Sequence, residues 1–391
     1  MSESPAQQVV ATGTDAARVA GDLVERLRAP DLRLAFVFAD WRLDPVTIAE
    51  VTQRGLAPAP VVGGTTVGVI APAAGRAGGR GDEPPAAAAL GLYGDWVRAG
   101  VGVAPELPKS PLARSRDAVE QAAVALGTRA AELDPARHVG VTIADGSGGH
   151  EEAFCIGSAA AAPQIRVIGG CVATELQSSR KPYIWVNGEV LADAGAVILI
   201  ETELPVCAVT STHLLPTDVR TVVTGAAGRV VTELDGHPAG RRLHELVRQL
   251  GDEVDRPGPA ALPLPTRYAF ARYVGGAPYV RSILHVGGDH VVLAGTVEPG
   301  HVLRLMRSGD LIGTTRRDLA AAAERVGGTM VALLAVSCIG RHLEAAARAI
   351  ERELAEVYAA YPTIGFQSSS EQTGPSLVNH TLTGLAIGAR R

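Results

Sequence analysis

Two carboxylates stand at matching places behind glycine-bearing apolar segments. Glu175 and Glu371 each come six residues after such a glycine, Gly169 and Gly365. Small side chains there let a ligand approach backbone N–H groups closely. A carboxylate in these surroundings can pair with a ligand ammonium, cap a neighbouring helix or face water. The small residues that precede the two carboxylates are Cys171, Thr174, Ser368, Ser369 and Ser370.

One arginine lies within an apolar segment. Arg281 is flanked by Val280 and, two residues on, by Ile283, in a stretch that has the length and composition of a strand. An unpaired charge is costly inside a protein. Arg281 therefore pairs with an internal acid such as Glu371, presents its guanidinium to a ligand carboxylate, or faces solvent through strand alternation.

A cysteine follows the most apolar segment of the chain. Cys338 comes directly after Val331–Val336 and Ser337, and it precedes Arg341 and His342 at the start of an expected helix. A helix N-terminus and a nearby guanidinium both stabilise a thiolate. Cys338 is thus a candidate nucleophile or ligand-lining residue, and the alternative is a small buried side chain.

These residues require a scaffold of strand–helix–strand units. Leu34–Ala39 is an apolar run that ends at Asp40, Asp44-Pro45 is typical of a helix start, and Val61–Gly64 predicts a second strand. Thr65 and Thr66 follow that strand, and Val69 stands where the other two copies carry a glutamate.

The same order recurs twice. Val139–Ala144 ends at Asp145 and leads through an expected helix, Glu151–Ala160, to Val167–Gly170. Val331–Val336 leads through a helix over Arg341–Ala359 to Thr363–Phe366. The copies indicate either an internal duplication or the general similarity of such units.

The stretches between the units favour antiparallel hairpins. Asn187-Gly188 is a two-residue turn signal, and Gly287-Gly288 joins two further apolar runs. Residues 71–89 are of low complexity and predict a surface loop. We therefore expect an α/β fold of two domains, each with βαβ units plus antiparallel hairpins forming mixed sheets: an N-terminal extension 1–30, a domain 31–225 and a domain 226–391.

Composition narrows the functional class. The 391 residues carry a formal charge of −5 and 4% aromatic residues, so neither charge nor stacking favours nucleic acid. No apolar run reaches the roughly 18 residues of a membrane helix. The four cysteines are scattered and form no CxxC pair, which argues against a disulfide scaffold and a zinc knuckle. The histidines lack the i, i+4 spacing of metal ligands on a helix, which argues against a metal site. We expect a cytoplasmic protein with no metal, no cofactor, no nucleic-acid partner and no membrane partner.

Five short motifs resemble the FIST family in order and spacing, over about residues 30–385. Val61–Gly68 resembles the start of the FIST N domain, and Val231–Ala239 resembles its end. Tyr279–Ile283, Ser337–Arg341 and Asn379–Thr381 resemble the FIST C domain. The family's usual Gly-Glu pair is replaced by Gly68-Val69 in the first half and by Ser370-Glu371 in the second.

The resemblance implies a sensory module of signal transduction that binds small ligands such as amino acids. The remaining segments are too short for a kinase, methyl-accepting or cyclase module, so a separate signalling protein would be the partner. The candidate ligand contacts are Thr65, Thr66, Asp145, Cys171, Thr174, Glu175, Arg281, Cys338, Arg341, Ser368, Ser369, Ser370, Glu371 and Asn379. The alternative is a hydrolase or transferase with Cys338 or a serine of 368–370 as nucleophile and His342 or Glu371 as base.

Overall fold

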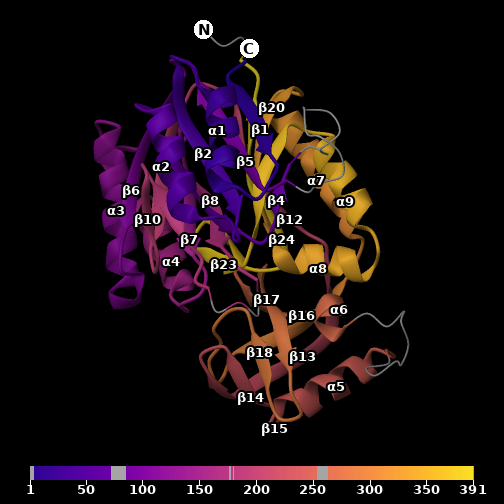
Figure 1. The fold of residues 1–391 in the computed structure, drawn as a ribbon. Helices are drawn as coiled ribbons and strands as arrows, with labels where there is room; N and C mark the ends of the chain where they lie inside the picture. Colours follow the sequence, from indigo (N-terminus) through magenta and orange to yellow (C-terminus); the bar gives the residue numbers. More distant parts are fainter. Residues whose placement is uncertain (1–3, 72–84, 176–177, 179, 253–262, 391) are drawn as a thin grey trace.

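The computed structural model describes residues 4–71, 85–175, 178, 180–252 and 263–390. Their strands form four sheets that are covered by helices (Figure 1). The expected α/β fold with mixed sheets is confirmed. Among the described residues, no helix is both long and apolar enough to cross a bilayer.

The first sheet defines a unit that the chain repeats. Its strands are adjacent in the order β1-β5-β2-β3, and only the β2–β3 pair is parallel. Helices α1 and α2 pack on its outer face. The bounds are β1 (Ala6–Ala11), α1 (Ala16–Leu27), β2 (Leu32–Asp40), α2 (Pro45–Leu56), β3 (Val61–Thr66) and β5 (Ala87–Tyr93).

The second sheet has the same order and directions, β6-β11-β7-β8, again with one parallel pair. Helices α3 and α4 cover it. The bounds are β6 (Val97–Ala104), α3 (Pro111–Ala125), β7 (His138–Asp145), α4 (Glu151–Ala161), β8 (Arg166–Val172) and β11 (Gly195–Thr202).

The third sheet repeats the pattern once more as β12-β24-β20-β21. Helices α7, α8 and α9 cover it. The bounds are β12 (Val206–Thr212), α7 (Leu311–Arg325), β20 (Met330–Cys338), α8 (Ile339–Ala347), α9 (Glu351–Ala359), β21 (Thr363–Ser368) and β24 (Thr381–Gly388).

A fourth sheet is inserted between β12 and α7 of the third unit. It lies at the end of the molecule opposite the chain termini, drawn in orange in Figure 1. Residue 225 lies within the first strand of this sheet. The expected domain boundary between residues 225 and 226 remains a prediction. The bounds are β13 (Leu214–Ala227), β14 (Val230–Leu234), β15 (His237–Pro238), α5 (Ala239–Gln249), α6 (Leu264–Arg267), β16 (Tyr268–Val274), β17 (Ala277–Val286), β18 (Val291–Leu293) and β19 (Val302–Ser308).

Short strands exchanged in a cycle join the three units. After the third strand of each unit, the chain adds β-structure to the third strand of another: β4 to β21, β9 to β3, and β22 to β8. The turn of the β9–β10 hairpin is Asn187-Gly188, and both residues have the left-handed φ that the two-residue turn signal predicts. The bounds are β4 (Val69–Ile70), β9 (Ile184–Val186), β10 (Glu189–Leu191), β22 (Ser370–Thr373) and β23 (Ser376–Val378).

One glycine position recurs in the three parallel pairs for the same steric reason. Gly63, Gly169 and Gly365 each lie opposite a residue of the neighbouring parallel strand. A Cβ at any of them would clash with the main-chain oxygen of that residue. The repeated glycines therefore allow each pair to form.

The inner faces of the three repeated sheets share one apolar core. Phe38 of β2 stacks on Phe366 of β21 with ring centroids 4.4 Å apart, and Ile143 and Ile168 come from the second unit. Burial of this surface is the main stabilising contribution that holds the strand ends in place.

Three local expectations need adjustment. Residues 1–30 supply β1 and α1 of the first unit. Residues 72–84 of the expected loop 71–89 lie outside the described residues. Residues 87–89 belong to the buried strand β5, so the expected end of the loop at residue 89 is wrong. The expected helix Arg341–Ala359 is two helices, because the helical backbone is interrupted at Ala349, which has a φ of 54°.

Candidate functional site

The ends of the three glycine-bearing strands meet at one place. The Thr66 hydroxyl lies 2.9 Å from the main-chain oxygen of Gln367. The Ser369 N–H donates to the oxygen of Cys171 at 3.0 Å, and the Ala173 N–H donates to that of Thr65 at 3.4 Å. The three strand ends therefore lie together, and Thr65 and Thr66 are buried among them.

Glu371 is buried at this junction among protein donors. The Ser368 hydroxyl donates to its Oε1 at 2.6 Å, and the Thr381 N–H donates to Oε2 at 3.3 Å. Burial raises the pKa of Glu371 to about 8, although these hydrogen bonds act in the opposite direction. Glu371 is therefore largely protonated at neutral pH and is not a free anion for a ligand.

Cys338 is the neighbour of Glu371, and its environment does not favour a thiolate. Burial and the Glu371 charge raise the pKa of the Cys338 thiol well above its ordinary value. The expected stabilisation of a thiolate by the helix start and Arg341 is not found, because burial outweighs the hydrogen bonds from the Gly340 and His380 main chain, which lower the pKa. Asn379 completes this region, and its Nδ2 donates to the main-chain oxygen of Ser369 at 3.5 Å.

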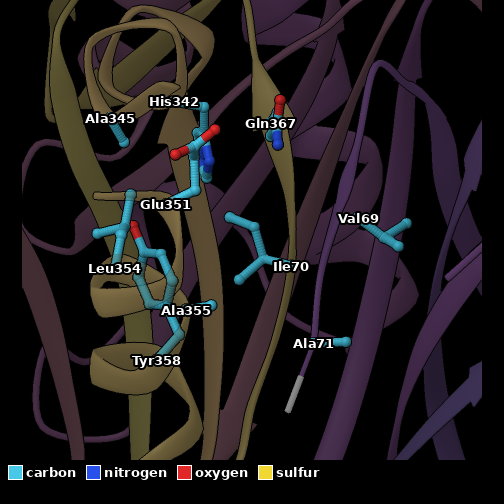
Figure 2. Close-up of a pocket in the computed structure, with 10 residues that line it drawn as sticks. All are labelled: Val69, Ile70, Ala71, His342, Ala345, Glu351, Leu354, Ala355, Tyr358 and Gln367. Atoms are coloured by element: carbon cyan, nitrogen blue, oxygen red, sulfur yellow. The ribbon is translucent and has the colours of Figure 1, made fainter. Parts of the chain in front are cut away.

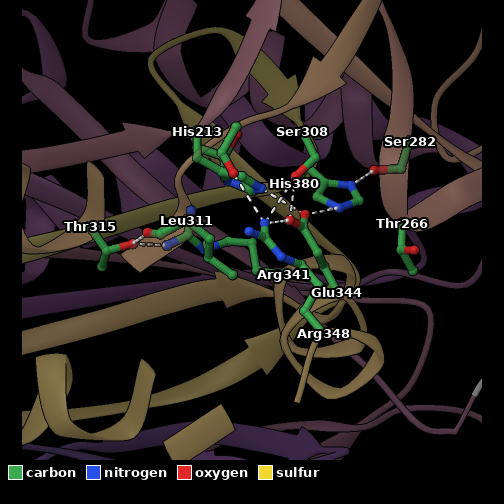
Figure 3. Close-up of polar contacts among 12 residues, drawn as sticks. His213, Thr266, Ser282, Ser308, Leu311, Thr315, Arg341, Glu344, Arg348 and His380 are labelled. Atoms are coloured by element: carbon green, nitrogen blue, oxygen red, sulfur yellow. Dashed lines mark hydrogen bonds and ion pairs between the residues drawn. The ribbon is translucent and has the colours of Figure 1, made fainter. Parts of the chain in front are cut away.

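Arg341 belongs to a buried polar cluster that the sequence did not reveal. Its Nη2 donates to the Thr315 hydroxyl at 2.6 Å. Beside it, the buried Glu344 carboxylate contacts His213 Nε2 at 2.7 Å and lies 3.6 Å from His380 Nε2 (Figure 3). Ser308, at the end of β19 in the inserted sheet, also donates to Glu344, so the cluster joins this sheet to α8.

The cluster lowers the pKa of two of its members for different reasons. Burial lowers the pKa of His213 to about 4, against the pull of Glu344. Burial opposes ionisation of Glu344, but hydrogen bonds from His213, His380 and Ser308 outweigh it and hold its pKa well below the ordinary value. At neutral pH an ionised Glu344 accepts from a neutral His213.

Arg281 is buried and paired, but not with Glu371. Its Nη2 donates to Glu152 Oε1 at 2.6 Å, and its Nη1 donates to the oxygen of Leu377 at 2.8 Å. The acid is 129 residues away and lies on α4 of the second unit. Arg281 thus joins the inserted sheet to that unit.

The carboxylate at the end of β7, in the second unit, accepts hydrogen bonds from groups of the same unit. Asp145 is buried and accepts from the Ser147 N–H at 2.8 Å, the Ser147 hydroxyl at 2.7 Å and the Asp193 N–H at 2.9 Å. Cys171 and Ser370 are buried beside it, as neighbours in the ladder between β8 and β22.

Thr174 and Glu175 lie apart from Glu371. The Thr174 hydroxyl donates to the oxygen of Arg180 at 2.9 Å. Glu175 is exposed, and its charge acts on Arg42. The two glutamates at matching sequence positions therefore do not share one environment.

The first unit's strand end opens into a cavity of about 490 Å³. Asp40, the last residue of β2, lies in its wall, and the side chain of Arg42 is 70% exposed against 12% for Asp40. Arg42 donates from Nε to Oδ1 and from Nη2 to Oδ2 of Asp40, both at 2.8 Å, and this pairing raises the pKa of Arg42. We call this the Asp40–Arg42 pocket; Thr14, Gly68, Val69 and Gln367 also line it.

Asp40 ends the apolar run 34–39, but it is not among the site residues predicted from the sequence. The i, i+2 spacing of Asp40 and Arg42 after an apolar strand was the available signal. His342, the other candidate base, lines a different cavity on the far side of β4. Among the described residues, no three His, Cys, Asp or Glu side chains are grouped so as to hold a metal ion.

Comparisons with known proteins identify two domain models along the chain. The FIST N domain matches residues 33–237, and the FIST C domain matches residues 239–373. No curated protein matches the chain. A solved structure described as a cyanuric acid hydrolase from A. caulinodans aligns with 98% of this chain and 99% of its own, at 10% sequence identity and a TM-score of 0.38.

Proposed function

Because this chain belongs to the FIST family, whose domains are sensory domains of signal transduction, we propose that it senses a small amino-acid-like or amine metabolite. We propose the Asp40–Arg42 pocket as the binding site. The ligand would be a small zwitterion, and a separate signalling protein would receive the response.

The observation that carries this proposal is the pair of opposite charges at an open strand end. Ligands of α/β proteins bind outside the carboxyl ends of parallel strands, where Asp40 ends β2 and Thr66 ends β3. The equivalent ends in the other two units, Asp145 and Cys338, face protein partners instead. A cavity of about 490 Å³ is within the range of small-molecule sites.

Arg42 and Asp40 would each bind one charged group of the ligand. Arg42 keeps N–H groups that Asp40 does not use, and a guanidinium binds a carboxylate in a planar, two-point manner. The carboxylate of Asp40 would accept from the ligand ammonium. The negative charge of Glu175, which acts on Arg42, would also favour binding of an amine at the entrance of the pocket.

The contacts predicted from the sequence take a supporting part in this proposal. Thr65, Thr66 and Ser369 would hold the strand ends that form the pocket floor through Gln367. Cys338 and Ser368, two of the candidate nucleophiles, both lie buried at Glu371. We therefore propose no second function.

A melting-curve panel tests the proposal. The protein is heated with each amino acid, with simple amines and with carboxylic acids that lack the amine, and binders are titrated by calorimetry. We expect an amino acid to raise the melting temperature, and R42Q and D40N each to weaken its affinity about tenfold or more.

Matched exposed variants control for charge alone. Arg54 and Asp22 are on the outer helices α2 and α1, and each forms a long surface pair with a residue of its own helix. R54Q and D22N should bind as the unmodified protein does. If no amino acid or amine shifts the curve, or if R42Q and D40N bind as tightly as these controls, the proposal is wrong.

A further inference from the structure

A second cavity, of about 350 Å³, lies between β4 and the helices of the third unit. Figure 2 shows His342, Glu351, Leu354 and Tyr358 on the side formed by α8 and α9, with Ile70 facing them from β4. It shares Val69 and Gln367 with the Asp40–Arg42 pocket, so β4 separates the two cavities. We call it the His342–Glu351 pocket.

Two polar side chains of this pocket lack a hydrogen-bond or ion-pair partner among the described residues. His342 Nε2 is shielded from solvent and has no hydrogen-bond partner among the described residues. Glu351 is exposed at the start of α9, and no ion pair to it is found in the described part of the chain. Leaving a shielded nitrogen unpaired costs free energy that a bound hydrogen-bonding group would recover.

The charge of the pocket has one sign. Burial and the neighbouring Arg341 lower the pKa of His342 to about 3, so its ring is neutral at physiological pH. Arg341 itself is buried and donates to Thr315. Glu351 is therefore the charged group that a ligand meets, and it attracts cations and repels carboxylates.

Apart from Gln367, the remaining wall is apolar. Ile70 and Leu354 are buried aliphatic side chains, and the Tyr358 hydroxyl is already used, since it donates to Ser337 at 3.1 Å. The ring of Tyr358 therefore presents hydrocarbon surface to the cavity. Such a wall binds an apolar body and compensates poorly for burying further polar groups.

We propose that the His342–Glu351 pocket is a second binding site, specific for a small amine with an apolar or aromatic body. The ammonium lies at Glu351, a hydrogen-bonding group of the ligand reaches His342 Nε2, and the body packs on Ile70, Leu354 and Tyr358. This ligand class differs from a compact zwitterion, because no free cation in the described lining would hold a carboxylate. The proposal does not depend on the function proposed for the Asp40–Arg42 pocket.

Titration calorimetry with tyramine as the probe tests this proposal. The control ligand is 3-(4-hydroxyphenyl)propionate, which has the same ring and a carboxylate in place of the amine. We expect tyramine to bind the full chain and the carboxylate to bind at least about tenfold more weakly. E351Q should weaken tyramine binding by about tenfold, since a charge-assisted contact becomes a neutral one.

Three further variants locate the probe. Glu353 lies exposed on the same helix, so E353Q should leave tyramine affinity unchanged. I70F should fill the cavity and abolish binding, while R42Q should bind tyramine normally. Absence of tyramine binding at concentrations up to about 10 mM, equal binding of the carboxylate, or loss in R42Q but not in E351Q would each overturn the proposal.

Discussion

Thr66 and Gln367 are 301 residues apart in the sequence, yet the Thr66 hydroxyl lies 2.9 Å from the Gln367 main-chain oxygen. The same hydroxyl also lies 2.9 Å from the Gly68 oxygen and accepts from the Gly68 N–H at 3.1 Å. This contact joins the first unit to the third at the wall of the Asp40–Arg42 pocket. The pocket therefore depends on closure of the three-unit arrangement.

Replacing Thr66 should weaken that closure. T66V keeps the shape of the side chain and removes the hydroxyl, so half-buried main-chain groups at Gly68 and Gln367 lose a partner. We expect the free energy of unfolding to fall by about 1–3 kcal/mol, measured by urea unfolding. T232V, at an exposed threonine of β14, should change it by less than about 0.5 kcal/mol. Equal effects of the two variants would contradict this joint.

Glu371 should make the protein less stable as the pH rises. The folded state holds the proton to a pKa of about 8, while the unfolded chain releases it near 4.5. Between these values the folded state binds more protons, so the free energy of unfolding falls with increasing pH, by up to about 1.4 kcal/mol per unit. E371Q carries no such proton and should lack this contribution.

The comparison is made on the difference between the two proteins. Urea unfolding of the unmodified chain and of E371Q across that pH range should show the unmodified chain losing stability relative to the variant. E203Q, at an exposed glutamate, should follow the unmodified chain at every pH. A constant difference for E371Q would show that the buried carboxyl does not titrate as described.

His213 should act in the opposite direction, at lower pH. Its pKa is about 4 in the folded state and 6.5 ordinarily, so between these values the unfolded chain binds the extra proton. The contribution of His213 to the free energy of unfolding therefore falls by about 3 kcal/mol as the pH drops from 6.5 to 4, opposite in sign to that of Glu371. H213Q should lack this contribution, whereas His342, whose pKa is also lowered, should contribute with the same sign in both proteins. H237Q, at an exposed histidine, should leave the slope unchanged.

The cysteines should differ in reactivity. Cys155, Cys171 and Cys338 are buried, and burial raises the pKa of each thiol, whereas Cys207 is partly exposed. Iodoacetamide at neutral pH should therefore label Cys207 first, as located by mass spectrometry of peptides. C207S should take up no label until it is unfolded. Rapid labelling of Cys338 in folded C207S would show that its thiol is accessible and activated.

The repeated strand–helix–strand order could be predicted because its signals are local. The apolar runs 34–39, 139–144 and 331–336 lie within β2, β7 and β20, as their composition predicts. Asp44 caps α2 by accepting from the Thr47 N–H at 2.9 Å, as its place before Pro45 suggested. The recurring glycines also have a local cause, in the close approach of the paired parallel strands.

The rest of the site depends on contacts between distant parts of the chain. Arg281 pairs with Glu152 and His213 with Glu344, over 129 and 131 residues, and no periodicity predicts such partners. The exchange of β22 onto β8 buries Glu371, whereas Glu175, at the matching sequence position, lies exposed. Matching sequence positions therefore do not predict matching environments, because the following segment of each unit takes a different path.

The place of the ligand is tested most directly by a crystal structure of the full chain grown with the amino acid that raises its melting temperature most. We predict density in the Asp40–Arg42 pocket, with the ligand carboxylate within about 3.2 Å of a guanidinium nitrogen of Arg42 and its ammonium equally close to Asp40. An empty pocket in the presence of that amino acid, or density at another place on the protein, would contradict the assignment.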